Sequence, residues 1–366
     1  MSRHSNFIAA AAILLALAIL SPAPASAQTR FPKLTVQNSG TSEGLIAVSP
    51  VNAKVVWAAG RHGTFLLTTD GGATWTSGQV PNAKWLQFRG VRAVSATTAY
   101  LLSIGNAPGN FRIYKTEDGG ATWTMQFKND LAGAFYDCFA FWTPTRGIAH
   151  SDSVNGVFPD LRTEDGTTWQ SIADNMPPAL SGEFSFSSSN TCVATQGQDN
   201  AWIATGGAPI ARILATMDGG DTWNAYDTPI VSSPSAGAFT VDFRDASNGI
   251  VGGGDLDPSD PDNARTAAST DGGQTWAFTT APPVTGAIFG LSYVRQLGKT
   301  CIRPICQETQ HYVVVTADSG GAAWTPDEGT TWYVLPGVSG CWAVAFATPN
   351  AGWLVGTGGQ IIKISF

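Results

Sequence analysis

Short apolar runs alternate with clusters of Gly, Asn, Asp, Ser and Thr through most of the chain. This pattern predicts many short strands joined by tight turns, because apolar and β-branched residues favour strands and the small polar residues favour turns. The runs fall into groups of four, and each group predicts one antiparallel sheet. Two groups illustrate this: 88–94, 99–104, 111–116 and 122–127, and 191–196, 201–205, 211–216 and 222–226.

One turn, with the pattern Ser/Thr-x-Asp-x-Gly-x-Thr-Trp, recurs between the third and fourth strands of six groups. Successive tryptophans are 48, 46, 54, 53 and 56 residues apart, which is close to the length of one propeller blade. The third copy is one residue shorter, and the sixth has Glu328 in place of the first glycine. The paired turn residues are Asp70 and Trp75, Asp118 and Trp123, Asp165 and Trp169, Asp218 and Trp223, Asp271 and Trp276, and Asp327 and Trp332.

Each residue type of this turn has a structural role. We expect the aspartate to accept hydrogen bonds from backbone N–H groups of its own turn. The glycines adopt backbone conformations that a side chain hinders, and the tryptophan is expected to bury its ring between neighbouring sheets. A turn repeated around a ring cannot bring all its copies into one site. The turn aspartates are therefore expected to stabilise the fold and not to act in catalysis or metal binding.

The last group explains how the ring closes. It contains three strands, 341–346, 351–355 and 360–366, and no recurring turn, while an extra strand, 31–37, precedes the first full group. Open sheet edges are sites of unwanted pairing, so strand 31–37 is expected to complete the last sheet. The sequence thus predicts an all-β, seven-bladed β-propeller of four-stranded antiparallel blades, formed as a single domain by residues 28–366.

The recurring turn resembles the Asp-box, or BNR repeat, of bacterial sialidases, sortilin-type receptors and photosystem II assembly factors. Spacing and length are most similar to the exported bacterial propellers of the assembly-factor-like group. The resemblance implies the propeller fold over nearly the whole chain after residue 27, but no particular activity, because one fold supports many functions. Besides the turns, it is carried by 101–105, 112–116, 135–137, 147–152, 182–183, 201–207 and 249–255.

The first 27 residues have the pattern of a cleaved signal peptide. Arg3 gives a basic start, 7–20 is almost entirely apolar, and Ala25-Ser26-Ala27 fits the small-x-small cleavage rule. The alternative is a retained membrane anchor, but an apolar run of about 14 residues is shorter than a bilayer span requires. We expect a secreted or periplasmic protein that begins at Gln28 and has no membrane span.

The charge balance restricts the choice of partner. Of 20 Lys and Arg, only Arg3 lies in the signal segment, which leaves 19 against 27 Asp and Glu and a net charge of −8. An acidic, lysine-poor surface disfavours nucleic acid and anionic membranes as main partners. A protein or carbohydrate ligand is expected, and the chain is expected to be a monomer.

Five cysteines follow the signal segment, in a compartment that permits disulfides. Cys301 and Cys306 flank a short stretch between two strand-like runs, and a disulfide between them is the preferred pairing. Cys138 with Cys192 is a second possible pair, since both lie in apolar strands where buried thiols also occur. The odd count leaves at least one cysteine unpaired or paired between molecules.

Two acids are candidates for carbohydrate cleavage. Asp137, preceded by Tyr136, and Glu183 lie at or just before the innermost strands of consecutive blades, and glycosidases use two carboxyl groups about 5 to 9.5 Å apart. The alternative is that these acids hydrogen-bond neighbouring blades. Sialidase chemistry is disfavoured, because the Phe-Arg-Ile-Tyr stretch 111–114 ends in Tyr114 where the sialidase motif has proline, and it lies on a third strand.

Arg89 and Arg92 lie on the innermost strand of the second blade. We expect both side chains to point the same way and to present positive charge to an anionic ligand. The alternative is an ion pair with Asp137 of the next blade. For photosystem assembly factors the resemblance implies a larger arginine patch in partner binding, of which this chain has only the pair.

His150 and Asp152 form a further candidate pair, for acid–base chemistry or metal binding. With four histidines and no His-x-x-x-His spacing, a metal centre is not expected, and no cofactor-binding motif occurs. The run 255–263, which begins with Asp255, lacks the central glycine and final glutamate of an EF-hand loop. We interpret it as a solvated acidic loop, with calcium binding as the alternative.

These observations favour a non-catalytic, extracytoplasmic binding or assembly propeller that presents one face of its channel to a protein or glycan. The alternative is a carbohydrate-active enzyme, a glycosidase or sialidase-like hydrolase, that acts through Asp137 and Glu183. Any site is expected on the innermost strands and their loops, away from the recurring turns.

Overall fold

The computed structural model describes residue 1 and residues 31–105, 107–257, 263, 265–294, 301–302, 305–306, 311–318 and 320–366. Contacts divide the chain into two units, Met1–Arg30 and Phe31–Phe366. The expected signal peptide, apart from residue 1, lies outside the described residues, and all strands belong to the second unit. Within the described part of the chain, no helix is long and apolar enough to cross a membrane.

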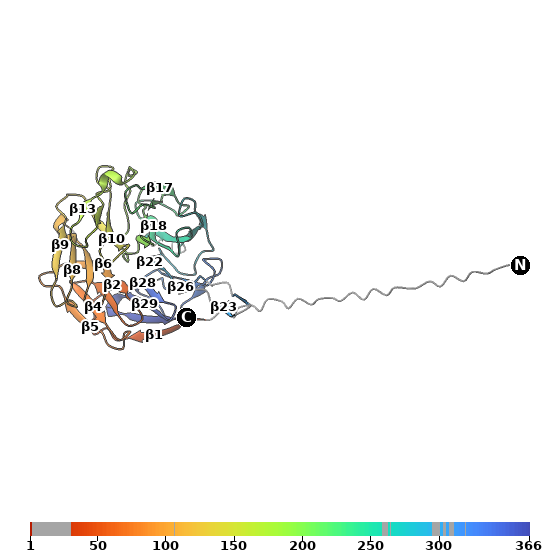
Figure 1. The fold of residues 1–366 in the computed structure, drawn as a ribbon, viewed down its shortest axis with the longest axis horizontal. Helices are drawn as coiled ribbons and strands as arrows, with labels where there is room; N and C mark the ends of the chain where they lie inside the picture. Colours follow the sequence, from red (N-terminus) through yellow and green to blue (C-terminus); the bar gives the residue numbers. More distant parts are fainter. Residues whose placement is uncertain are drawn as a thin grey trace. The chain divides into compact units, whose positions relative to one another are not determined.

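Seven four-stranded antiparallel sheets form the blades of a propeller in the second unit (Figure 1). The first strand of each blade contacts the first strands of the two neighbouring blades, so these strands surround a central channel. In blades 1 to 6 the chain runs from the innermost strand outwards and then enters the next blade. The predicted fold class and blade number are confirmed.

The strands of blades 1 to 4 follow chain order from the inside outwards. They are β2 (Leu45–Pro50), β3 (Val56–Gly60), β4 (Thr64–Thr68) and β5 (Thr76–Gln79); β6 (Gln87–Ala93), β7 (Ala99–Ile104), β8 (Arg112–Thr116) and β9 (Thr124–Lys128); β10 (Tyr136–Phe141), β11 (Gly147–Ser151), β12 (Leu161–Thr163) and β13 (Gln170–Ser171); and β14 (Val193–Gln196), β15 (Asn200–Ala204), β16 (Arg212–Thr216) and β17 (Asn224–Asp227).

Blade 6 contains a two-stranded hairpin between its first two strands, and blade 7 combines the two ends of this unit. The strands of blades 5 to 7 are β18 (Ala236–Phe243), β19 (Gly249–Asp255), β20 (Arg265–Ser269) and β21 (Ala277–Phe278); β22 (Gly290–Tyr293), β25 (Val313–Thr316), β26 (Ala322–Thr325) and β27 (Tyr333–Val334), with the hairpin β23 (Cys301–Ile302) and β24 (Ile305–Cys306); and β28 (Cys341–Thr348), β29 (Ala351–Gly356), β30 (Ile361–Ser365) and β1 (Lys33–Gln37).

Strand β1 closes the ring, as the missing turn of the last blade predicts. It pairs with β30 in antiparallel register, from Lys33 opposite Ser365 to Gln37 opposite Ile361. The Gln37 side chain then joins blade 7 to blade 1, because its Oε1 accepts the indole N–H of Trp75 at 3.1 Å. This arrangement leaves no open edge between the first and last blades.

Large aromatic side chains on the second strands fill the gaps between several blades. Three of them are fully buried: Trp57 of β3, Tyr100 of β7 and Trp202 of β15. The N–H or O–H group of each side chain donates a hydrogen bond to a backbone carbonyl of the next blade. Burying one such side chain stabilises the fold by about 1.5–3 kcal/mol. The three hydrogen bonds run from Trp57 Nε1 to Ser95 O (2.9 Å), from Tyr100 Oη to Gly166 O (3.1 Å), and from Trp202 Nε1 to Gly272 O (2.8 Å).

The tryptophans of the recurring turns are less buried than the sequence suggests. Trp223 is buried, and the other five turn tryptophans are half-buried. Trp123 packs edge-on against Phe65 and Trp57 of the preceding blade, with ring centroids 5.1 and 6.2 Å apart. The turn tryptophan therefore covers the rim of an interface whose centre is filled by a second-strand aromatic side chain.

The recurring turn is held together by its aspartate. In blade 2, Asp118 accepts hydrogen bonds from Thr116 Oγ1 (2.9 Å), Thr122 N (2.8 Å) and Thr122 Oγ1 (2.5 Å), and Gly120 N donates to Thr116 Oγ1 (2.9 Å). Each of the other turns repeats the bonds from the Ser or Thr hydroxyl and from the later Thr N–H. Their aspartates are Asp70, Asp165, Asp218, Asp271 and Asp327.

Recurring turns lie at the end of the channel where the innermost strands finish. The first glycine of a turn donates its N–H to the loop after the innermost strand of the same blade, as from Gly71 N to Lys54 O (2.8 Å) and from Gly119 N to Thr97 O (2.9 Å). We call this the turn end of the propeller. The opposite end, where the innermost strands begin, is the mouth end.

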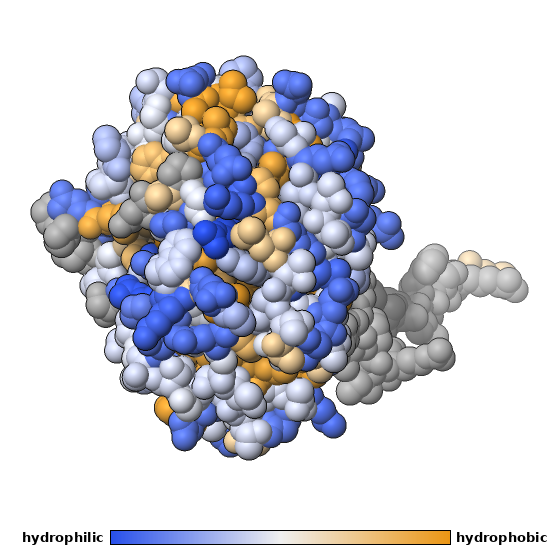
Figure 2. Space-filling model, turned by 90° about the vertical axis from the view of Figure 1, so that its left-hand side faces the viewer, coloured by the Kyte–Doolittle hydropathy of each residue, from blue (hydrophilic) through white to orange (hydrophobic). Residues whose placement is uncertain are grey.

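Polar side chains dominate the rim of the propeller. The outermost strands β5 and β9 are largely exposed, and hydrophilic residues predominate on the side shown in Figure 2, with hydrophobic residues in small groups among them. Exposed aromatic side chains also occur there, such as Phe278 on the outermost strand β21.

Candidate functional site

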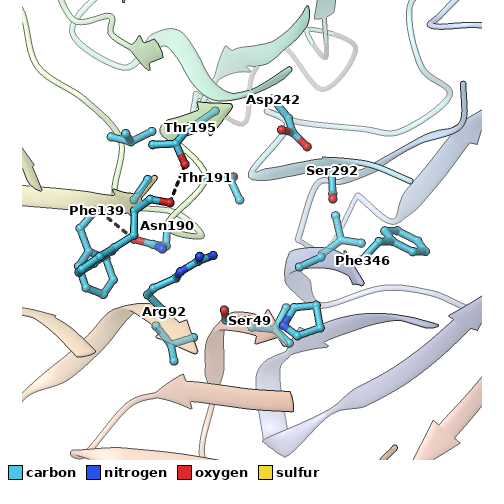
Figure 3. Close-up of a pocket in the computed structure, with 18 of the residues that line it drawn as sticks. Ser49, Arg92, Phe139, Asn190, Thr191, Thr195, Asp242, Ser292 and Phe346 are labelled. Atoms are coloured by element: carbon cyan, nitrogen blue, oxygen red, sulfur yellow. Dashed lines mark hydrogen bonds between the residues drawn. The ribbon is translucent and has the colours of Figure 1, made fainter. Parts of the chain in front are cut away.

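The turn end of the channel contains a polar cavity of about 430 Å³ that residues of all seven blades line (Figure 3). Arg92 of blade 2 and Asp242 of blade 5 project from opposite sides of it. The Asp242 carboxylate accepts the N–H groups of Phe243 and Tyr293, both at 2.8 Å. Asp242 therefore connects the innermost strands of blades 5 and 6.

A second cavity of about 320 Å³ lies at the mouth end, and we call it the mouth pocket. Its residues come from the starts of the innermost strands, the segments before them and the ends of two second strands, in blades 2 to 7. The pocket is lined by Arg89, Phe135, Asp137, Asp152, Phe184, Ser185, Phe186, Ser187, Ser188, Phe239, Leu256, Phe289 and Trp342.

A continuous chain of aromatic rings forms one wall of the mouth pocket. Phe184 and Phe186 of blade 4 lie 4.9 Å apart between ring centroids, Phe186 stacks on Phe239 of blade 5 at 3.7 Å, and Phe289 of blade 6 meets Trp342 of blade 7 at 5.2 Å. Phe239 and Phe289 are 6.3 Å apart and complete the chain. Phe184, Phe289 and Trp342 keep part of their surface exposed, so a ligand has direct access to aromatic surface.

Arg89 lies at the end of this aromatic chain. Its guanidinium carbon is 4.9 Å from the Trp342 ring centroid, a cation–π contact, and its Nη1 donates to Ser187 O at 2.6 Å. Burial, together with the charge of Arg61, lowers the pKa of Arg89 to about 10, so it stays charged at neutral pH. Its Nε is buried and has no acceptor among the described atoms.

The expectation that Arg89 and Arg92 point the same way is wrong. Arg89 lines the mouth pocket, whereas Arg92 lines the turn-end cavity. Residues an odd number of positions apart face opposite sides of a strand, and β6 also changes register between Phe88 and Gly90. The alternative, an ion pair of Arg89 with Asp137, does not occur among the described ion pairs, but the charge of Asp137 favours the charged form of Arg89.

Asp137 and Asp152 form an acid pair in the mouth pocket. They lie close enough for each to shift the pKa of the other. Burial, followed by the proximity of Asp152, raises the pKa of Asp137 well above its usual range, and burial also raises the pKa of Asp152. Two neighbouring carboxyl groups cannot both ionise cheaply. Their raised pKa values therefore favour one retained proton in the pair. Among the described atoms, Asp137 Oδ2 has no hydrogen-bond partner.

Glu183, the other candidate acid, is not part of that pair. Its carboxylate accepts Arg212 Nε (2.9 Å), Arg212 Nη2 (2.5 Å), Thr205 Oγ1 (2.7 Å) and Leu180 N (2.8 Å). The side chain has no exposed surface. Glu183 is therefore a buried ion-pair partner that fixes the long connection between β13 and β14, which supplies Phe184 and Phe186 to the mouth pocket.

Tyr136 and His150 are buried beside the pocket rather than in it. The Tyr136 hydroxyl donates to Pro159 O at 2.9 Å, and burial raises its pKa. His150 Nδ1 lies 2.9 Å from Asp160 Oδ2, and both side chains are fully buried. His150 thus pairs with Asp160 and not with Asp152. Among the described residues, no group of three or more His, Cys, Asp and Glu side chains is arranged to hold a metal ion.

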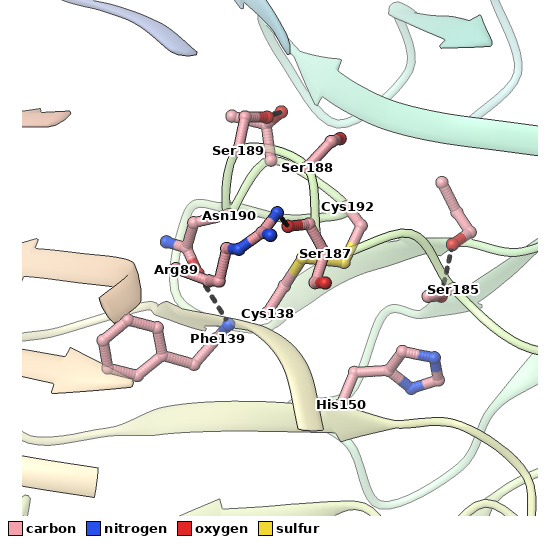
Figure 4. Close-up of a disulfide and its surroundings, with 12 residues drawn as sticks. Arg89, Cys138, Phe139, His150, Ser185, Ser187, Ser188, Ser189, Asn190 and Cys192 are labelled. Carbon is pink, nitrogen blue, oxygen red and sulfur yellow. Dashed lines mark hydrogen bonds between the residues drawn. A yellow bond between two sulfur atoms is a disulfide. The ribbon is translucent and has the colours of Figure 1, made fainter. Parts of the chain in front are cut away.

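A disulfide joins Cys138 to Cys192 and holds two walls of the mouth pocket together (Figure 4). Cys138 directly follows Asp137, and Cys192 follows the segment 184–188 that lines the pocket. Next to the bridge, Phe139 N donates to Asn190 Oδ1 at 3.0 Å. Burial raises the pKa of the unpaired Cys341 thiol to about 12.

The preferred pairing of Cys301 with Cys306 concerns side chains that lie outside the described part, although their backbones are directly opposite each other in the β23–β24 hairpin. Part of the acidic run 255–263 also lies outside it. Asp255 itself accepts the N–H of Asp257 at 2.9 Å. No calcium-site geometry can be assigned to this run.

The sialidase-like stretch 111–114 lies away from the channel, on the third strand of blade 2. Arg112 Nε donates to Gly109 O at 2.7 Å, and the guanidinium covers the Trp85 ring at 4.7 Å. Arg112 therefore has a structural role at the rim of its blade.

Sequence reasoning identified Arg89, Asp137 and Asp152 but missed the aromatic wall. Phe184, Phe289 and Trp342 stand in or next to the segments that begin blades 4, 6 and 7. In the sequence, each of these blades has an aromatic residue at the start of its innermost strand or shortly before it. The pattern is hard to recognise because the distance from this residue to the strand differs from blade to blade.

Solved structures with the same fold are similar to this chain at low sequence identity. YCF48 bound to a D1 peptide has a TM-score of 0.62 and 14% identity, covering 93% of this chain and 98% of that one. YCF48 from Cyanidioschyzon merolae has a TM-score of 0.58 and 16% identity, covering 91% and 98%. The WD40 β-propeller domain of Doa1 has a TM-score of 0.55 and 11% identity, covering 91% and 97%. No protein-family model and no curated protein matches the sequence.

Proposed function

We propose that this protein is a non-catalytic, extracytoplasmic propeller that binds a polypeptide segment of a partner protein at its mouth end. The observation that carries the proposal is the chain of partly exposed aromatic rings across blades 4 to 7, ended by Arg89. Aromatic and arginine side chains are the groups that dominate protein recognition sites.

Two further observations support a polypeptide ligand. The mouth pocket is concave and most of its accessible surface is apolar, with a small number of polar groups at fixed places, which is typical of a binding site. The YCF48 structure that shares this fold contains a bound D1 peptide. A peptide bound in this way would keep the recurring turns free for their structural role at the other end.

The extracytoplasmic location is supported by the Cys138–Cys192 disulfide, since stable disulfides persist in oxidising compartments. The measurement is the thiol state in the native cell. Mass spectrometry after rapid alkylation should find these two cysteines unmodified by the alkylating reagent and the chain starting at Gln28. Alkylation of both cysteines in undamaged cells would contradict the location.

The geometry of the acids supports binding over glycoside cleavage. Glu183 is enclosed by Arg212, Thr205 and a backbone N–H. Asp137 and Asp152 are close enough to raise the pKa of Asp137, whereas glycosidases separate their two carboxyl groups by about 5 to 9.5 Å so that a sugar or water fits between them. Glu183 is already neutralised by Arg212, so it does not supply the second free carboxyl group that this chemistry needs.

A peptide-library selection against the mature full-length protein tests the proposal. The enriched peptides are then measured by fluorescence polarisation on the wild type and on Trp342→Ala, with Arg92→Gln in the turn-end cavity as the matched control. We expect Trp342→Ala to weaken binding at least about tenfold, as for an interface hot spot, and Arg92→Gln to leave it unchanged.

Three results would overturn the proposed function. The first is that no peptide is enriched, and the second is that binding responds to Arg92→Gln and not to Trp342→Ala. The third is that a glycan array gives ligands that depend on Trp342 while peptides give none.

A further inference from the structure

We propose that the mouth pocket receives a tyrosine side chain of the partner polypeptide, whose phenol hydroxyl hydrogen-bonds both Arg89 and the acid pair of Asp137 and Asp152. This inference rests on the proposed function and names the residue that the pocket recognises.

The size of the pocket fits one large side chain. A cavity of about 320 Å³ is at the lower limit of small-molecule sites. Its walls are rings from four blades, which offer both faces and edges to an inserted ring. Aromatic pairs favour such offset and edge-to-face contacts. An aromatic side chain therefore matches the shape and chemistry of the walls better than an aliphatic one.

The charge balance of the pocket selects a neutral group. Arg89 lines the pocket with one positive charge. Asp137 and Asp152 line it together, and because two neighbouring carboxyl groups cannot both ionise cheaply, the pair contributes one negative charge. The charge of a lysine or arginine ligand would be repelled by Arg89, and the charge of a glutamate or aspartate ligand would be repelled by the acid pair. Bringing an unpaired charge into a largely buried site is costly. A neutral ligand avoids both costs.

The polar atoms of the pocket require a ligand that both donates and accepts a hydrogen bond. Arg89 lines the cavity, and its guanidinium, which has five N–H donors, makes two hydrogen bonds, to Ser187 O and Gln87 Oε1. The carboxyl groups of Asp137 and Asp152 line the same cavity and offer acceptor oxygens. A phenol hydroxyl has one donor and two acceptor lone pairs, whereas an indole only donates and a phenylalanine ring does neither. Tyrosine is therefore the residue that satisfies both sides.

The test uses the mature full-length protein and four pentapeptides, Ac-Gly-Ser-X-Ser-Gly-NH2, in which X is Tyr, Phe, Lys or Glu. Dissociation constants come from isothermal titration calorimetry at pH 7. We expect the tyrosine peptide to bind about fivefold more tightly than the phenylalanine peptide, the difference that one ordinary hydrogen bond makes. The lysine and glutamate peptides are expected to bind more weakly than both.

Variants then locate the preference. Asp137→Leu removes a carboxyl group and should reduce the ratio of tyrosine to phenylalanine affinity to about one. Asp152→Asn is a second, milder variant, to be used if Asp137→Leu fails to fold. It removes the other carboxyl group of the pair and should also reduce the preference for the tyrosine hydroxyl. Phe289→Ala should weaken both peptides equally, and Asp130→Ala, on an exposed turn, should change nothing.

The outcomes separate this inference from the proposed function. Equal binding of the tyrosine and phenylalanine peptides, both lost in Trp342→Ala, overturns the tyrosine inference and leaves peptide binding intact. So does a preference for lysine or glutamate, or binding of selected library peptides that lack tyrosine. If no peptide of any kind binds, the proposed function fails as well.

Discussion

Acidic side chains at the two ends of this propeller are in opposite states. At the turn end, the hydroxyl groups of Thr74, Thr122 and Thr275 donate to the exposed turn aspartates of their blades. These bonds, with those from the backbone, lower the pKa of Asp70, Asp118 and Asp271 to about 2. At the mouth end, Asp137 is buried and Asp152 is half-buried, and the pKa values of both are raised. The same residue type therefore forms a structural turn at one end and a polar site at the other.

The difference shows why the recurrent motif is a poor guide to the site. Each of these exposed carboxylates already accepts about three hydrogen bonds within its own turn, so it stabilises the turn and does not form a binding site. A buried carboxyl group with a neighbour of the same charge keeps its proton and faces an apolar cavity. Four predictions test this contrast, beginning with the largest expected effect.

Removing the disulfide should destabilise the mouth end most. The double change Cys138→Ala and Cys192→Ala opens a loop with a sequence separation of 54, and the loop-entropy relation gives a loss of about 4 kcal/mol. Chemical unfolding of the two proteins measures it. Cys341→Ala, which removes a buried unpaired thiol, is the control and should cost about 1 kcal/mol or less. A loss from the double change no larger than the control would contradict the role of the bridge.

Glu183→Gln should have the next largest effect, because it leaves the buried Arg212 without a counter-charge. We expect a loss of about 3 kcal/mol in the free energy of unfolding. The matched control is Glu164→Gln, since Glu164 also pairs with arginines but is 59% exposed. Because exposed ion pairs contribute about 0.5 kcal/mol to the free energy of unfolding, Glu164→Gln should cost no more than that. Similar losses in the two variants would show that burial does not distinguish these ion pairs.

Asp137→Asn should remove a pH dependence that is specific to the mouth end. The raised pKa of Asp137 means that its stabilisation is complete below the ordinary aspartate pKa of about 4 and is lost as pH rises through the folded value. The introduced amide does not titrate. The wild type should therefore lose at least about 1 kcal/mol relative to the variant between pH 4 and pH 8. Parallel stability curves would refute the retained proton.

Asp118→Ala should have the smallest effect and the opposite pH dependence. The lowered pKa of Asp118, about 2, means that its contribution is present above pH 4 and is lost as pH falls towards 2. At pH 7 we expect a decrease of about 1 °C in Tm, and the difference from wild type should vanish near pH 2. Thermal unfolding between pH 2 and pH 7 measures this, with Asp130→Ala as the control. A difference that grows on acidification would contradict the turn chemistry.

Local sequence determined the architecture of this protein. Each blade needs four short strands and a turn, and the residues that make them are neighbours in the chain, so their pattern can be read directly. The absence of a turn after residue 360 and the extra strand at 31–37 also predicted the closure, which β1 and β30 confirm. Arg89 and Asp137 were recognisable because charged residues are unusual on innermost strands, whereas Asp152 was noticed only as a neighbour of His150 at the end of a second strand.

Only the tertiary structure decided how these groups are paired. Asp137 lies near Asp152, His150 contacts Asp160, and Glu183 contacts Arg212. Each choice depends on the packing of connections whose course is not periodic. The aromatic wall is the clearest case, because its rings come from four blades and meet only where the ring of sheets brings their first strands together. Sequence patterns specify each blade separately, whereas the pocket is a property of all the blades around one axis.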